Sequence, residues 1–199
     1  MKYLIFLALI SSCGAKIQST RMSTAQGDEQ AMSITDEWVM TDTKLAIKEV
    51  ISQVQRHNGY RRYLSKMQGR PKIFIAEVQN NTADAYFPVA DLNDELLNEF
   101  SISGGYVLID EAARNRILNE IKYQNDGMIK MEDVRKIGKQ SGANLLIFGT
   151  INMRPHTLNG KTIKEYSVNI RMTDIESGEE VLRTRYTISK YSKRSNFSF

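Results

Sequence analysis

Side chains that commonly carry out catalysis or bind metals are scarce in this chain. Its 199 residues include one cysteine, Cys13, and two histidines, His57 and His156. One cysteine can form neither an intramolecular disulfide nor a cysteine-based metal cluster, and both histidines lie in polar segments, where a surface role is simpler than metal ligation. The sequence contains no HExxH, no GxSxG and no phosphate-binding P-loop. We therefore expect no catalytic residues, no metal and no cofactor.

The charged residues indicate neither nucleic-acid binding nor an active site. Lysine and arginine total 27 against 23 acidic residues, so the net charge is +4, too small to indicate nucleic-acid binding. Asp91 with Asp94, and Glu179 with Glu180, could act as a general acid and base. The first pair lies where a helix should begin and the second in a hairpin turn, so we interpret both as solvated charge clusters.

The N-terminus has the features of an export signal. Lys2 precedes an uncharged apolar run over residues 3–10, and Ser11-Ser12 lead to Cys13. The run is shorter than the roughly 20 apolar residues that span a bilayer, and its composition is typical of a signal peptide. The surroundings of Cys13 resemble a bacterial lipobox, which implies lipidation of this cysteine after removal of residues 1–12. The alternative is a buried N-terminal strand with an ordinary thiol.

The next segment is expected to tether a folded domain to the membrane. Residues 14–33 are mostly small or polar and have no apolar periodicity. We therefore expect a lipidated N-terminus and flexible tether over residues 13–33, a domain over 34–192 and a short tail over 193–199. About 20 such residues typically reach about 25 Å, with a contour limit near 70 Å. The protein should be lipid-anchored in the cell envelope, at the outer membrane or the periplasmic face of the inner membrane.

A first helix is expected from Thr41 onward. Ile47, Val50, Ile51 and Val54 follow the i, i+3, i+4, i+7 spacing of an amphipathic helix. Thr41 or Asp42 is expected to cap its N-terminus. Trp38 is either a packing anchor for this helix or an exposed aromatic residue at an interface.

The remaining pattern predicts a mixed sheet. Apolar runs predict strands over 73–78, 106–109 and 145–148, the last of them central because it is apolar throughout. Apolar spacing predicts helices from near Asp91 to Phe100, over 111–122 and over 131–140. Two strands with alternating polarity, around 166–172 and 182–188, are joined by a turn at 176–179. The expected fold is α/β (α+β): about five strands, helices mainly on one face and a C-terminal β-hairpin.

One basic, tyrosine-containing segment is the best candidate for a binding surface. Its residues Arg56, Tyr60, Arg61, Arg62 and Tyr63 precede the first strand. Such a cluster could contact anionic lipid headgroups, an anionic glycan polymer or an acidic protein surface. The alternative is a solvated helix face.

Several segments, in their order, resemble the LpoB-type lipoproteins, whose domain is similar to the N-terminal domain of TolB. The resemblance runs from Thr41 to about Lys190, and it rests on Thr41-Asp42, 69–71 (Gly-Arg-Pro), 78–82 (Val-Gln-Asn-Asn-Thr), Ser103-Gly104, 141–144 (Ser-Gly-Ala-Asn), Tyr166 and 173–179 (Thr-Asp-Ile-Glu-Ser-Gly-Glu). Asn144 stands where an aspartate is usual, and Leu182 or Arg183 where a tryptophan is common. The best-known members also have a long proline-rich tether, which this chain lacks.

The resemblance implies a function as a partner protein. LpoB-type lipoproteins activate bifunctional peptidoglycan synthases, the penicillin-binding proteins. A membrane-anchored lipoprotein that binds and activates such a synthase is therefore expected, without enzymatic activity, nucleic acid or a small-molecule substrate. The alternative is a structural or secretion-associated envelope lipoprotein of the same fold.

Overall fold

A single five-stranded sheet organises the molecule. The computed structural model describes residues 23, 26–27, 35–109 and 131–193. The strands are β1 (Lys72–Asn81), β2 (Val107–Leu108), β3 (Leu145–Leu158), β4 (Lys161–Asp174) and β5 (Glu180–Lys193), in the order β2-β1-β3-β4-β5. β1 pairs in parallel with β2 and β3, whereas β3, β4 and β5 are antiparallel. The sheet is therefore mixed, and β3 is central, as predicted.

The helices lie mainly on one face of the sheet, as the sequence predicts. They are α2 (Met40–Arg56), α3 (Asn58–Lys66), α4 (Val89–Ser103) and α6 (Met131–Ser141). The main core fills the space between the sheet and α2, α3 and α4, with fully buried residues such as Ile47, Leu96 and Ile147. α6 packs on the opposite, outer face through Gly138, where an added Cβ would lie 2.4 Å from Ile175 Cγ2. The predicted helix over 111–122 lies outside the described residues.

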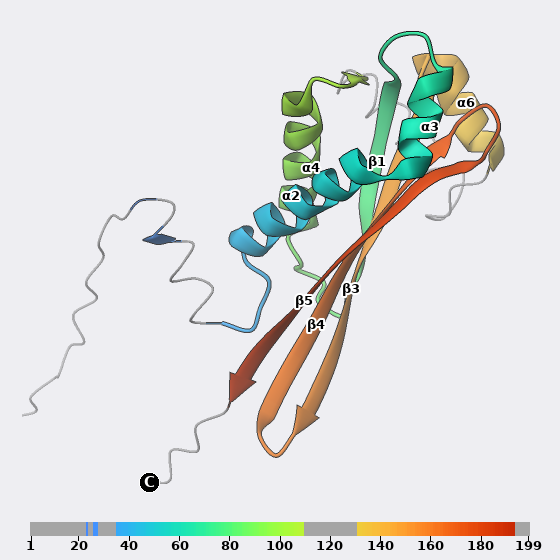
Figure 1. Cartoon of the computed structure of the whole chain (residues 1–199). Coiled ribbons are helices and arrows are strands. Elements are labelled where there is room, and N and C mark those ends of the chain that lie inside the picture. Colours follow the sequence, from blue (N-terminus) through green and yellow to red (C-terminus); the bar gives the residue numbers. More distant parts are fainter. Residues whose placement is uncertain (1–22, 24–25, 28–34, 110–130, 194–199) are drawn as a thin grey trace, which may run out of the picture.

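The last three strands are longer than predicted and form a ribbon that extends beyond the helices (Figure 1). β3 runs to Leu158 instead of ending near Phe148, and β4 starts at Lys161. Asn159 and Gly160 between them have positive φ angles of 49° and 70°. Two successive left-handed residues make the tight turn that suits a twisted hairpin, and Asn-Gly is its preferred sequence. The Asn-Gly pair was therefore the signal for this hairpin.

The first helix begins differently from the prediction. The N-cap is Val39, and neither Thr41 nor Asp42 occupies that position. Asp42 instead lies in the first turn, where its Oδ2 accepts a hydrogen bond from the Val39 backbone N–H at 2.9 Å. An acidic residue in the first turn also interacts favourably with the helix dipole.

Trp38 is a packing anchor, which settles the choice that the sequence left open. It is only 7% exposed and packs against Phe87 and Tyr166, with ring centroids 5.5 and 5.4 Å away. Its Nε1 donates a hydrogen bond to Thr43 Oγ1 at 2.8 Å. A buried indole usually finds such a partner.

Candidate partner-binding surface

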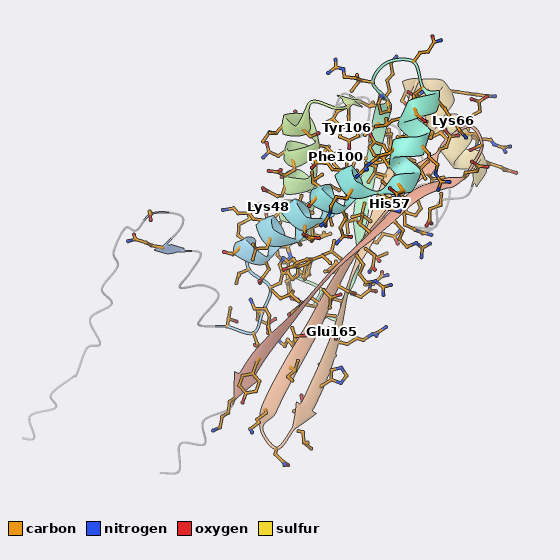
Figure 2. All side chains as sticks on the ribbon, in the orientation of Figure 1. Lys48, His57, Lys66, Phe100, Tyr106 and Glu165 are labelled. Atoms are coloured by element: carbon orange, nitrogen blue, oxygen red, sulfur yellow. The ribbon has the colours of Figure 1, made fainter. Side chains whose placement is uncertain are left out.

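The basic segment of the sequence forms a separate helix, α3, at a corner with α2. Figure 2 shows His57 at this corner. His57 is the N-cap of α3, and its Nδ1 accepts hydrogen bonds from the backbone N–H groups of Gly59 at 3.1 Å and Tyr60 at 3.4 Å. These bonds satisfy N–H groups that have no partner within the helix. His57 is thus used as a structural cap.

Tyr60, one of the five predicted site residues, faces the core. It is 4% exposed, and its ring stacks on Tyr106 with centroids 5.9 Å apart. Tyr106 in turn meets Phe100 edge-on at 5.0 Å. Burial raises the pKa of Tyr60 well above its usual value. Tyr60 therefore anchors α3 to the sheet and is not on the outer surface.

Tyr63 joins α3 to the turn between β4 and β5. Its hydroxyl donates a hydrogen bond to Asp174 Oδ2 at 2.9 Å, while Asp174 Oδ1 accepts bonds from the N–H and hydroxyl of Ser177. Burial opposes the charge on Asp174, but the bonds from Ser177 and Tyr63 outweigh it and lower the Asp174 pKa. Burial, reinforced by Asp174, raises the pKa of Tyr63. The pair is thus a phenol bonded to a carboxylate.

Close backbone approach also fixes α3 against β5. An added Cβ on Gly59 would lie 2.5 Å from the backbone oxygen of Val181. Glycine is the residue that permits such an approach. Together with Tyr60 and Tyr63, this contact mounts α3 rigidly on the end of the sheet.

The three predicted arginines lie at the α2–α3 corner with exposed side chains. Arg56 pairs with Glu49 on α2 at 2.9 Å, and Arg61 Nε donates to the Gln55 carbonyl at 3.4 Å. The side chain of Arg62 is also exposed. The structure thus brings the five predicted residues together, with tyrosines inward and arginines outward. Contact of these arginines with a partner stays a prediction.

The sequence analysis missed a second group of arginines, which lies on the outer face of the sheet. Arg171, Arg183 and Arg185 line a shallow hollow of about 240 Å³. The guanidinium of Arg171 lies 4.3 Å from the ring centroid of Phe148, and Arg183 binds both carboxylate oxygens of Glu180 at 2.9 and 2.8 Å. The hydrogen bond from Arg183 lowers the pKa of Glu180. In the sequence, the signal for this outer group was the alternation of arginine with apolar residues along the last two strands.

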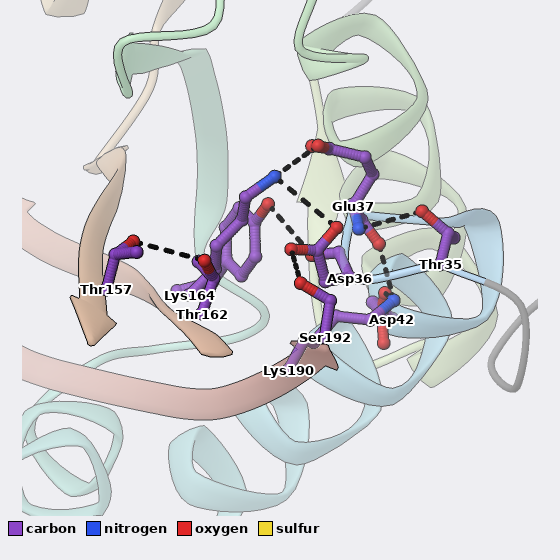
Figure 3. Close-up of polar contacts among 10 residues, drawn as sticks. Thr35, Asp36, Glu37, Asp42, Thr157, Thr162, Lys164, Lys190 and Ser192 are labelled. Atoms are coloured by element: carbon purple, nitrogen blue, oxygen red, sulfur yellow. Dashed lines mark hydrogen bonds and ion pairs between the residues drawn. The ribbon is translucent and has the colours of Figure 1, made fainter. Parts of the chain in front are cut away.

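A polar network fastens the start of the domain to the ribbon (Figure 3). Ser192 Oγ donates to Asp36 Oδ2 at 2.7 Å, and Lys164 pairs with Asp36 at 3.6 Å and with Glu37. The bond from Ser192 is the main cause that lowers the Asp36 pKa; partial burial opposes it and the charge of Lys164 supports it. Burial disfavours the charge on Lys164, but Glu37 and Asp36 raise its pKa overall.

The buried part of this network is an ion pair. Lys190 Nζ lies 2.7 Å from Asp42 Oδ2 and also donates to the Glu37 carbonyl. The two side chains are 7% and 1% exposed. A buried charge is tolerated only when it is paired and hydrogen-bonded. The network therefore holds residues 36–42 across the ribbon.

The described residues also bear on metal binding and on membrane-spanning helices. Within residues 35–109 and 131–193, no three or more histidine, cysteine, aspartate or glutamate side chains are grouped so that they could hold a metal ion. In the same part of the chain, no helix combines the length and apolar character that a membrane span requires.

Comparison with known proteins identifies a family. The family model described as "Peptidoglycan-synthase activator LpoB" matches residues 42–188. No curated protein sequence matches the chain. The C-terminal domain of LpoB from Salmonella enterica is 14% identical, with a TM-score of 0.54, over 74% of this chain and 98% of that one. The corresponding Escherichia coli domain is 15% identical, with a TM-score of 0.54, over 75% and 99%. The NMR structure of E. coli LpoB is 14% identical, with a TM-score of 0.51, over 93% and 88%.

Proposed function

Because this chain belongs to the LpoB family of peptidoglycan-synthase activators, we propose that it is an envelope lipoprotein that binds and activates a penicillin-binding protein. The supporting observation is that the family match runs from the first turn of α2 into β5 and so includes both the sheet and α3. The family is regulatory rather than catalytic. We propose accordingly that the chain acts by binding and has no enzymatic turnover.

Activation by binding sets a thermodynamic requirement. A partner shifts an enzyme toward its active state only to the extent that it binds that state more tightly than the inactive one. A rigid contact surface discriminates between two shapes of a partner better than a mobile one. α3 has this property, because its inner side is held by Tyr60, Tyr63 and Gly59.

The exposed arginines of α3 are the proposed contact for the synthase. Arg61 and Arg62 follow one another on the outward side of the helix and are exposed. Arginine is enriched among the residues that dominate binding energy at interfaces, since its planar guanidinium can form several hydrogen bonds at once. An acidic surface on the synthase would be its complement. The short expected tether places this partner surface within about 70 Å of the anchoring membrane.

Charge reversal on two different surfaces tests this proposal. The lipidated chain would be used to capture envelope proteins, with Arg61→Glu/Arg62→Glu as the test variant and Arg183→Glu/Arg185→Glu as the control. Both variants change the net charge by the same amount, but on opposite faces of the sheet. We expect capture and activation of a synthase by the wild type and the control, and loss of both with the α3 variant.

Other outcomes would contradict parts of the proposal. If only the control variant loses the synthase, the outer arginines are the contact and α3 is not. If no synthase is recovered and the protein yields only a ring-sized oligomer of itself, the structural or secretion-associated alternative replaces activation. Hydrolysis of peptidoglycan by the purified chain, abolished by one acidic substitution, would contradict the absence of turnover.

A further inference from the structure

The free end of the ribbon carries exposed apolar side chains on its outer side. Leu158, Ile163 and Tyr191 are 74%, 43% and 56% exposed. Ile163 lies directly opposite Tyr191 on β5, and Leu158 lies opposite Lys161 on β4. Side chains of directly opposed residues project from the same face of a sheet. Lys161 and Ile163 are two residues apart on β4 and so share this face, and Lys193 lies opposite Lys161. Leu158, Ile163, Tyr191, Lys161 and Lys193 therefore form one surface, here called the ribbon tip.

The ribbon tip is also basic. Lys161 lies directly opposite Lys193, and Arg154 lies further along β3 on the same face. Near the tip, the acidic residue on this face is Glu165 (Figure 2). It lies opposite Arg154 and two residues from Ile163. Like charges directly opposite one another destabilise a sheet. The lysine pair therefore does not stabilise the pairing of β4 with β5, and it suits an anionic ligand.

The N-terminal part of the chain leaves the domain near this tip. Ser192, the neighbour of both Tyr191 and Lys193, bonds to Asp36, and Lys164, next to Ile163, pairs with Glu37. The 34 residues that precede Thr35 include the apolar run and Cys13. Any membrane attachment through those residues therefore acts near the free end of the ribbon, although Ser192 and Lys164 project from the helix-covered face and the side chains of the ribbon tip from the outer face.

We propose that the ribbon tip docks on the surface of an anionic phospholipid bilayer, the one that holds the N-terminus. Leu158, Ile163 and Tyr191 would contact the interfacial region, where tyrosine is favoured, and Lys161, Lys193 and Arg154 would contact anionic headgroups. Each contact is weak alone, but attachment through the N-terminus raises the local concentration of the tip at the bilayer. A second copy of the chain fits this surface less well, because the contact would bring together two surfaces that each carry Lys161, Lys193 and Arg154 against a single nearby acid, Glu165.

Fluorescence quenching by lipid tests the docking. The full chain would be reconstituted into phosphatidylcholine vesicles that contain brominated lipid, with and without phosphatidylglycerol. Tyr191→Trp places a fluorophore at the tip, and Ile102→Trp places one at the exposed C-terminal end of α4, at the opposite end of the sheet. Trp38 is common to both variants, so their difference reports on the new position.

We expect several-fold stronger quenching for Tyr191→Trp than for Ile102→Trp in the anionic vesicles, and loss of this excess with Lys161→Glu/Lys193→Glu. That double variant exchanges one exposed like-charge pair for another, so its circular dichroism should be unchanged. Equal quenching at the two positions, or an excess that survives charge reversal, overturns the proposal. Crosslinking of tips in detergent without lipid would identify a second copy as the occupant and overturn it as well. Synthase capture through α3 should be unaffected, so the two proposals fail independently.

Discussion

Removal of the Lys190 amine should destabilise the domain strongly. Lys190→Met keeps most of the apolar stem, which lines the ribbon, but deletes the charge that lies 2.7 Å from Asp42 Oδ2. The Asp42 carboxylate would then be buried with the Val39 N–H as the remaining hydrogen-bond donor to it among the described residues, since Oδ1 has no partner there. Loss of one partner from a buried ion pair typically costs about 3–5 kcal/mol of unfolding free energy. For a domain of this size, such a loss lowers Tm by roughly 6–20 °C.

The double variant Asp42→Asn/Lys190→Met separates the ion pair from simple loss of side-chain atoms. It leaves no buried charge, so we expect it to be more stable than Lys190→Met alone and to differ from the wild type by about 1–3 kcal/mol, the cost of an incompletely hydrogen-bonded amide. The coupling free energy between the two positions should exceed about 1 kcal/mol.

Urea unfolding measures these differences, because Trp38 is the sole tryptophan and is buried four residues from Asp42. Far-UV circular dichroism provides the second probe. Lys193→Met, at an exposed position on the same strand, is the control and should change the unfolding free energy by less than about 0.5 kcal/mol. A coupling free energy of zero, or equal destabilisation at positions 190 and 193, would refute the assignment of a buried ion pair.

Three further predictions concern α3 and the start of the domain. Gly59→Ala should cost about 1–3 kcal/mol and weaken synthase capture, because its Cβ would meet a β5 backbone oxygen at 2.5 Å, whereas Gly105→Ala, with open space, should do neither. Tyr63→Phe should lower the unfolding free energy by about 1.5–3 kcal/mol through loss of its bond to Asp174; no change in urea unfolding would contradict this. Asp36, whose pKa is lowered in the folded state, stabilises the fold above its ordinary value of 3.8, and this contribution is lost as the pH falls through the lowered value. The unfolding free energy of Asp36→Asn should therefore fall less steeply with decreasing pH than that of the wild type. Identical dependence on pH in the two proteins would count against the pairing with Ser192.

The parts of the fold that bury apolar side chains were predictable from the sequence. Tyr166, Val168, Ile170 and Met172 alternate with polar residues, and all four are buried on the helix-covered face of β4. The far half of the ribbon was not predicted, because residues 152–165 are largely polar and have no core to impose a period of two. There the Asn-Gly turn was the usable signal.

The orientation of the tyrosines in α3 depended on contacts distant in sequence. Tyr60 and Tyr63 are three residues apart and appear equivalent in the sequence. One is buried by Tyr106, and the other is held by Asp174, 111 residues away. No local pattern distinguishes such partners, so the sequence located the basic helix but could not assign inward and outward side chains. Of the five predicted residues, the three arginines are the ones with exposed side chains.

The two proposals together make β5 a spacer between the membrane and the synthase contact. α3 contacts β5 at Val181, near its start, and Asp36, which follows the expected tether, bonds to β5 at Ser192, near its end. Eleven residues of strand span about 36 Å, compared with a typical reach of about 25 Å for the expected tether. With the ribbon tip on the bilayer, the height of α3 is set mainly by the strand and only weakly by the tether.

A longer tether should therefore have little effect. Doubling the expected tether with glycine and serine residues would lower the effective concentration of a freely tethered domain by a factor of about 3, since this concentration falls as the −3/2 power of length. If the tip holds the domain at the membrane, synthase activation by the anchored protein should stay within experimental error of the wild type. Combining the long tether with Lys161→Glu/Lys193→Glu should restore the dependence on length, because docking is lost. A threefold loss with the long tether alone would show that the tether, and not the ribbon, positions α3.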